Sequence, residues 1–297
     1  MKAVVLLYHR VFDLDTDPQQ LCVRVQHFAE HLAHLKQHFQ VISLRALIAA
    51  LRDRNLPDRA VVVTFDDGYA DNLWNAKPLL ERHGVPATIH VATGLLGREA
   101  EFWWDELERL VFFSRGLPEK LRIMGRVRKA ATPDRVYREI HRLLRPLPAG
   151  EQQAVITELR SQVHETPLPR PTHRVLTPDE LRTLASSDLV EIGAHSLTHS
   201  MLTSLSLEEQ RHEMAESKRS LESILGRAVR SFAYPFGGRE MVSRQTIGLA
   251  EECGFESACG TIAAPVSVKS DLFFLPRFLV RDWNGEEFGR RVPGFFR

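Results

Sequence analysis

Two clusters of metal-ligating residue types stand out in the sequence. Thr64-Phe65-Asp66-Asp67-Gly68 begins with the last two residues of the apolar run 60–65. Two adjacent carboxylates at the end of a buried strand are costly, because burial penalises each charge and the charges repel, and a cation or a functional proton would relieve that cost. In His195-Ser196-Leu197-Thr198-His199, two imidazoles four residues apart can face one ion if the segment is helical or tightly turned. Each cluster also has a plain alternative: the Asp pair could cap the following helix, and the histidines could be unrelated surface residues.

The elements around these clusters indicate how they would be positioned. Apolar runs rich in β-branched residues predict buried strands at 3–8, 60–65, 87–92, 190–194, 230–234 and 275–280. Amphipathic or capped segments at 25–37, 75–83, from 178 and 207–225 predict helices between them. Strands of this kind alternating with helices are typical of a parallel α/β sheet or barrel.

In such a barrel the carboxyl ends of all strands lie on one face, so Asp66, Asp67, His195 and His199 would converge there. Two histidines, one carboxylate and a water suit a catalytic zinc-type site. The spare carboxylate can then serve as a general base, which explains why two acids are useful where one would satisfy the metal.

The helix–strand alternation is interrupted between residues 102 and 172. Three helices are predicted there, at 104–113, 133–144 and 150–163, with no clear strand between them. A chain of 297 residues fits one barrel. We therefore expect a single domain, 1–297, with a helical insertion at 102–172.

Charge and hydropathy restrict the partners. The net charge of +1 does not single out nucleic acid. Residues 115–145 carry ten Lys or Arg and three acidic residues, which indicates either a solvated helical face or a docking surface for an anionic substrate or a membrane. The apolar N-terminal run ends at His9 and Arg10, too soon for a signal peptide, and no stretch is long enough to span a bilayer. We expect a cytoplasmic protein without a transmembrane segment.

The two clusters, together with Phe232-Ala-Tyr-Pro-Phe-Gly237, resemble the first three motifs of the NodB-type polysaccharide deacetylases, carbohydrate esterase family 4. The resemblance implies a distorted (β/α) barrel of about seven strands that removes N-acetyl groups from an amino-sugar glycan or precursor. It implies Asp66 as general base and Asp67, His195 and His199 as ligands of one divalent metal, Zn²⁺ with Co²⁺ or Ni²⁺ as alternatives. It also implies that the backbone N–H of Tyr234 helps to hold the oxyanion.

The sequence departs from this family at two places. The third-motif arginine, which pairs with the base, is Ala233 here, and Arg277 is a candidate to replace it, with an ordinary ion pair as the alternative. The late histidine that supplies the general acid is missing, since no histidine follows His212. Tyr8-His9 resembles the start of the poly-N-acetylglucosamine deacetylase branch, in which an early histidine takes the acid's place, so His9 is the predicted acid.

Several aromatic residues could contact a sugar. Trp103 and Trp104 could line the groove or begin the core of the insertion, while Pro235 and Trp283 are further candidates for substrate binding. Three other functions stay open: hydrolysis of C–N bonds in a non-sugar amide, an inactive carbohydrate-binding module, and partner docking through the basic segment.

Overall fold

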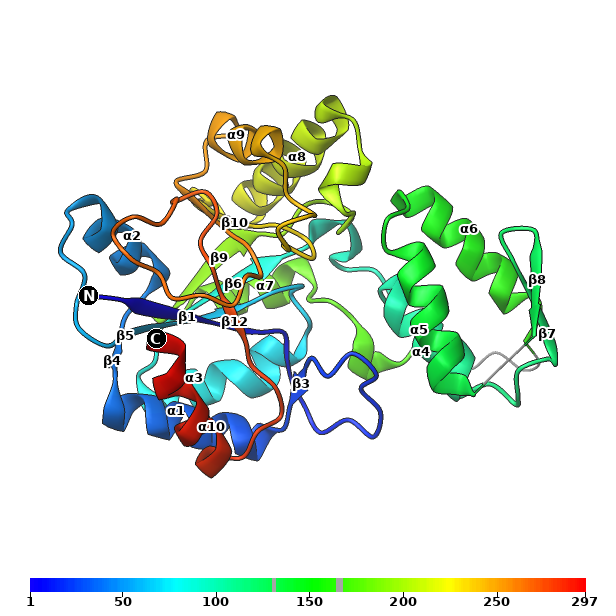
Figure 1. The fold of residues 1–297 in the computed structure, drawn as a ribbon, viewed down its shortest axis with the longest axis horizontal. Coiled ribbons are helices and arrows are strands. Elements are labelled where there is room, and N and C mark those ends of the chain that lie inside the picture. Colours follow the sequence, from blue (N-terminus) through cyan, green and yellow to red (C-terminus); the bar gives the residue numbers. More distant parts are fainter. Residues whose placement is uncertain (130–131, 164–167) are drawn as a thin grey trace.

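The computed structural model describes residues 1–129, 132–163 and 168–297. Within these ranges, seven parallel strands curl into an incomplete barrel in the spatial order β11-β10-β9-β6-β5-β1-β12, and a short β4 pairs with the start of β5 (Figure 1). The strands are β1 (Ala3–Tyr8), β4 (Gln40–Val41), β5 (Ala60–Phe65), β6 (Ala87–Val91), β9 (Val190–Ala194), β10 (Ser231–Ala233), β11 (Ser257–Cys259) and β12 (Phe278–Leu279). The distorted barrel predicted from the sequence is therefore confirmed.

The two edges of this sheet approach one another. Leu275, which precedes β12, forms a parallel bridge with Cys259 of β11, and β12 pairs with β1 through Phe278 and Leu279. The sequence analysis missed β11 because its three residues, Ser-Ala-Cys, make no apolar run. Closure at this edge brings the chain before β12, which includes Arg277, next to the end of β11.

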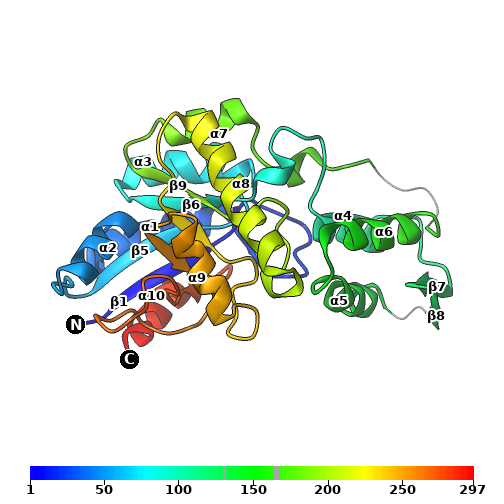
Figure 2. The ribbon, with the colours of Figure 1, turned by 90° about the horizontal axis from the view of Figure 1, so that it is seen from above.

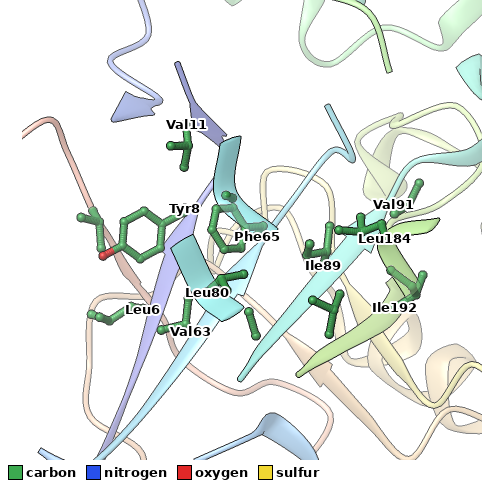
Figure 3. Close-up of a cluster of buried hydrophobic side chains, with 14 of the residues drawn as sticks. Leu6, Tyr8, Val11, Val63, Phe65, Leu80, Ile89, Val91, Leu184 and Ile192 are labelled. Atoms are coloured by element: carbon green, nitrogen blue, oxygen red, sulfur yellow. The ribbon is translucent and has the colours of Figure 1, made fainter. Parts of the chain in front are cut away.

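Alternate residues of each strand face opposite sides of the sheet. One set packs against the surrounding helices, and Figure 3 shows part of this cluster, including Leu6, Tyr8, Val63, Phe65 and Ile89. The other set, which includes Val5 and Val62, forms a separate buried cluster with helix α2. Thr64 and Asp66 follow Val62 with the same alternation, so they continue this second face to the carboxyl end of β5.

Seven α-helices surround the strands in the described part of the barrel. Ser206 and Thr177 form capping boxes that begin two of them, and Gly226 ends one with a left-handed φ of 64°. The helices are α1 (Val25–His38), α2 (Leu44–Arg52), α3 (Lys77–His83), α7 (Pro178–Ala185), α8 (Leu207–Leu225), α9 (Arg244–Glu252) and α10 (Gly285–Arg291), and a π-helical turn, Asn72–Ala76, precedes α3. No helix among the described residues is both long and apolar enough to cross a bilayer.

The insertion at 102–172 forms a lobe on one side of the barrel, away from both chain termini (Figures 1 and 2). It contains α4 (Trp103–Phe112), α5 (Pro133–Leu144) and α6 (Ala149–Arg160) around a second hydrophobic cluster, which also includes Tyr69, Ala92 and Val175 of the barrel. The prediction of a purely helical insertion is wrong, because β7 (Lys120–Ile123) and β8 (Arg126–Lys129) form an antiparallel hairpin. Met124 and Gly125 at its turn both have positive φ, and a Met there carries little of the usual Asn-Gly turn signal.

Two smaller strands lie between the barrel and this lobe. β2 (Arg10–Val11) follows β1 directly and pairs in parallel with β3 (Cys22–Val23). The short β2–β3 pair holds the chain that follows His9 at the carboxyl end of the barrel, beside the loop after β5, where Val11 N–H donates to Asp71 Oδ1 over 3.1 Å.

Candidate active site

Three predicted metal ligands meet at the carboxyl end of the barrel. Asp67 follows β5, and His195 and His199 follow β9. Asp67 Oδ1 lies 3.4 Å from His195 Nε2 and 3.3 Å from His199 Nε2, and all three side chains are buried. Their ligand atoms lie within 4.8 Å of one another, so one ion can contact all three.

The backbone of the site adopts conformations that L-residues rarely take. Asp67, Ser196, His199 and Phe236 have φ of 75°, 64°, 58° and 61°. Left-handed conformations at non-glycine residues cost energy, and they persist where the surrounding structure enforces them, often at functional sites. Here these residues cluster in the three motif loops at one end of the barrel.

A buried glutamate on α8 holds the loop between the two histidines. Glu213 Oε2 accepts from Leu197 N–H at 2.9 Å and Thr198 N–H at 2.8 Å, and its Oε1 accepts from the Thr198 hydroxyl at 2.6 Å. In the sequence Glu213 carries no signal of this role, because it is one of several acidic residues on a charged amphipathic helix. It gives the tight turn that lets two histidines four residues apart face the same point.

The two histidines are oriented differently. His195 Nδ1 lies 2.8 Å from Ala233 O, the backbone hydrogen bond that metal-binding histidines commonly make through their second nitrogen. His199 Nδ1 is buried without a hydrogen-bond partner among the described residues. Its ring is packed instead against Trp104 and Phe236, with centroid distances of 4.6 and 5.0 Å. Aromatic packing thus does for His199 what a hydrogen bond does for His195.

This donor set fits a divalent metal. Asp67 Oδ1 is buried and accepts no hydrogen bond of good geometry from the residues that the structure describes, which leaves it available to a cation. Burial raises the pKa of Asp67, but His195 and His199 outweigh burial and lower it, so this carboxylate is ionised and ready to coordinate. One carboxylate and two imidazoles suit zinc, cobalt or nickel.

The second carboxylate, Asp66, is held by an arginine from the other end of the chain. Arg277 lies just before β12 and donates from Nη1 to Asp66 Oδ1 at 2.8 Å and from Nη2 to Oδ2 at 2.6 Å. Its Nε donates to Gly260 O at 2.8 Å, and its side chain is only 1% exposed in total. Burial alone would raise the pKa of Asp66. The positive charges of Arg277 and then His195 outweigh this effect and hold the pKa well below its usual range. Arg277 therefore lies where the sequence analysis placed a substitute for the missing third-motif arginine.

His90 on β6 also approaches the base and was missed from the sequence. Its Nδ1 lies 3.3 Å from Asp66 Oδ1, and the ring is fully buried. Gly193 on the neighbouring β9 makes room for it, since a Cβ at that position would lie 2.3 Å from His90 Cδ2. The pairing of His90 with Gly193 across two strands is a signal that only the strand order reveals.

His9 follows β1 and lies at the same mouth. Burial lowers the pKa of its imidazole, and the nearby charges of Asp67 and then Asp66 oppose this without cancelling it. His9 Nδ1 has no hydrogen-bond partner in the described part of the chain. The ring is thus neutral at neutral pH and has a nitrogen free to take part in proton transfer.

The role predicted for the Tyr234 backbone is not supported. The Tyr234 N–H donates to Cys259 O at 3.0 Å as part of the sheet, and the phenol donates to Phe273 O at 2.8 Å. Pro235, which is buried, turns the chain after β10, and no hydrogen bond is recorded for the following N–H, that of Phe236, among the described residues. The N–H of Phe236, two residues later than predicted, is therefore available to donate to a ligand.

Two predicted sugar-contacting residues are core residues of the insertion instead. Trp103 and Trp104 are 8% and 4% exposed, and they pack on His141 and on Phe102 with centroid distances of 5.0 and 4.4 Å. Burial leaves neither ring a face for a sugar, which corrects that prediction.

Trp283 differs from these two residues because it is only partly buried. It lines a cavity of about 380 Å³ beyond the end of β12, together with Arg281 and Phe12. Its contact with substrate stays a prediction.

Comparisons with known proteins agree with this geometry. The family model described as "Polysaccharide deacetylase" matches residues 53–113 and 131–258. YxkH of Bacillus subtilis (strain 168) is 20% identical over 294 residues, 98% of this chain and 76% of YxkH. The poly-beta-1,6-N-acetyl-D-glucosamine N-deacetylase of Escherichia coli (strain K12) is 34% identical over 86 residues, 28% of this chain and 13% of that protein.

A solved structure shares the fold over the whole chain. The Streptococcus pyogenes deacetylase PplD, in complex with acetate, superposes with a TM-score of 0.67 at 18% identity, covering 100% of this chain and 99% of PplD. At that identity the superposition establishes the fold alone. The family model, however, spans more than half of the sequence, including Asp66, Asp67, His195 and His199. The chain belongs to the polysaccharide deacetylase family.

Proposed function

We propose that this protein is a metal-dependent hydrolase that removes N-acetyl groups from an amino-sugar glycan or glycan precursor and releases acetate. The observation that carries the proposal is the pair Asp66 and Asp67, in which neighbouring carboxylates have different partners. Asp67 faces two histidines, whereas Asp66 is held by Arg277. A site that only bound a metal would need Asp67 and not a second, separately oriented carboxylate.

The residues divide the reaction between them. A divalent ion held by Asp67, His195 and His199 would supply Lewis-acid polarisation of the acetyl carbonyl. Asp66, ionised and fixed by Arg277, accepts the proton of the attacking water. The Phe236 N–H is placed in the third-motif loop to donate to the developing oxyanion. His9, neutral before the reaction, takes up the proton that Asp66 has accepted from the water and passes it to the leaving nitrogen.

The substrate class follows from the relatives and from the acid. An amide nitrogen is a poor leaving group and requires protonation, which His9 can provide. The Escherichia coli relative is named for the N-deacetylation of poly-beta-1,6-N-acetyl-D-glucosamine, and oligomers of this sugar are the first substrates to try.

The experiment is acetate release from β-1,6-linked N-acetylglucosamine oligomers, with chelator and with added Zn²⁺ or Co²⁺. Asp66→Asn should abolish release while the active-site ion stays bound, and His199→Ala should weaken binding of that ion. Near-normal turnover by Asp66→Asn would contradict its role as base. If the protein binds the metal and hydrolyses a small non-sugar amide but no N-acetylated sugar, its substrate would be a non-sugar amide. Metal binding without hydrolysis of either would indicate a binding module.

Two further predictions are not part of this proposal. Lys120, Arg122 and Arg126 of the basic segment are exposed on the β7–β8 hairpin, at the end of the insertion remote from the barrel (Figure 1). A docking role for this segment and a cytoplasmic location both stay predictions.

A further inference from the structure

A second group of ligand-type side chains lies outside the active site, where the insertion joins the barrel. Asp105 and Glu108 are one turn apart on α4, and His173 lies on the turn that leads from the insertion back to the barrel. They are 7%, 3% and 4% exposed, and one potential ligand atom from each lies within 4.8 Å of the others.

His173 has the hydrogen-bonding pattern of a metal ligand. Its Nδ1 lies 2.9 Å from the Thr172 hydroxyl, which fixes the ring. Its Nε2 is buried, has no hydrogen-bond partner in the described ranges, and lies 3.8 Å from Glu108 Oε2. An imidazole with one nitrogen anchored and the other directed at two carboxylates is the usual arrangement around a bound ion.

There is space for an ion beside these residues. A cavity of about 20 Å³ is lined by Asp105, Glu108 and His173 together with Tyr69 and Asp17. This volume is enough for one water or one ion. Two carboxylates, one imidazole and a cavity of this size form a built site.

Among the described residues the Asp105 carboxylate makes no salt bridge, although Arg10, which also lines the cavity, and Arg170 lie near it. Arg10 pairs with Asp71 at 2.9 Å, and Arg170 pairs with Glu101 at 2.8 Å and with Glu108 at 3.2 Å.

The recorded partner of the Asp105 carboxylate is instead the Tyr69 hydroxyl, which donates at 2.6 Å. Burying an ionised carboxylate without a paired cation is costly, so a cation in the cavity would stabilise it.

We propose that Asp105, Glu108 and His173 bind a second divalent transition-metal ion, of the zinc or cobalt class, which ties α4 of the insertion to the segment that returns to the barrel. An imidazole with two carboxylates favours such an ion over Ca²⁺ or Mg²⁺, which prefer oxygen ligands alone. The site adjoins the active site, because the Trp104 indole N–H donates at 2.9 Å to Tyr69, and the Trp104 ring packs on His199.

The test counts metal ions per chain. The full protein is stripped with a chelator, reloaded separately with Zn²⁺ and with Co²⁺, desalted, and analysed by inductively coupled plasma mass spectrometry. The wild type should bind two ions. His173→Ala and His199→Ala should each bind one, and the double variant none. His141→Ala is the matched control, because His141 also has an unpartnered Nε2 in the insertion core but packs against aromatic rings, and it should still bind two.

Folding of each variant is checked by circular dichroism. If His173→Ala fails to fold, Asp105→Asn replaces it, since an amide preserves the shape and can still accept from Tyr69. Two results would overturn the proposal. In the first, the folded variant retains the second ion. In the second, the wild type binds only one ion, and His199→Ala binds none; the cavity would then hold a proton and a water. One ion bound by His199→Ala and lost in the double variant supports the second site, whether or not the protein deacetylates sugars.

Discussion

Replacing Arg277 by methionine should cost the protein both stability and turnover. The guanidinium contacts both oxygens of Asp66 and the carbonyl of Gly260, all inside the barrel. Methionine approximates the aliphatic part of the arginine side chain, but it removes the guanidinium and leaves the Asp66 carboxylate buried without this partner. Breaking a buried ion pair from one side costs about 3–5 kcal/mol, a large part of the roughly 5–15 kcal/mol that stabilises a typical domain.

The assay is urea unfolding followed by circular dichroism, supported by thermal melts. A loss of this size corresponds to a fall in Tm of about 6–20 °C for a chain that unfolds as a unit. Arg291→Met is the matched control. Arg291 pairs with Glu287 at 2.6 Å on the surface of α10, with half of its side chain exposed, and such a pair contributes about 0–1 kcal/mol.

A double variant distinguishes the stability lost with the ion pair from the stability lost with side-chain packing. Asp66→Asn removes the unpaired charge, so the Asp66→Asn, Arg277→Met double variant should recover much of the stability lost by Arg277→Met alone. Two results would refute the reasoning: a cost for Arg277→Met no greater than that of the Arg291 control, or a double variant less stable than the Arg277 single variant.

Two further predictions concern the barrel and the metal. Burial lowers the pKa of His31 to about 4, against about 6.5 in the unfolded chain, so the native state binds fewer protons in this window and its stability falls as the pH is lowered from 6.5 to 4, by up to roughly 3 kcal/mol. His31→Gln should flatten this part of the curve of unfolding free energy against pH, and an unchanged curve would contradict the assignment. Trp104→Leu should weaken binding at the active-site metal about 10-fold or more, because His199 loses its aromatic support. Chelator competition measures this, and Trp103→Leu, whose ring packs on His141, is the control that should bind as the wild type does.

Much of the barrel could be predicted because its long strands are continuous apolar runs in the sequence. The ends of β1, β5 and β9 match the sequence prediction residue for residue. The positions of Asp67, His195 and His199 then follow from a single property of parallel barrels, that the carboxyl ends of the strands share one face. No pairing between distant residues had to be known to bring these three together.

The parts that the sequence did not reveal depend on partners far along the chain. His31 is one of four histidines between residues 27 and 38, yet its ring is fully buried and lies 3.2 Å from the Tyr8 hydroxyl and 2.6 Å from Trp283 O. Its spacing from Phe28 and Leu35, three and four residues away, places it on the apolar face of α1 and could have shown this. His173 offers no such local signal, because its carboxylate neighbours lie more than sixty residues earlier.

Arg277, in the segment before β12, makes the ion pair with Asp66 that the family resemblance assigns to the third-motif position, which is Ala233 here. Ala233 pairs with Cys259 in the sheet, and Arg277 reaches Asp66 past Gly260, the next residue. Both positions therefore adjoin the end of β11. An arginine placed at 233 in the space left by Arg277→Ala should find the same carboxylate, so the double variant should be more stable and more active than Arg277→Ala.

Ala233→Arg alone should be harmful, because a second guanidinium overpacks the barrel interior at a cost of about 1–3 kcal/mol. Urea midpoints and acetate release measure both effects. A double variant no better than Arg277→Ala would show that this site requires the guanidinium to approach from the β12 side.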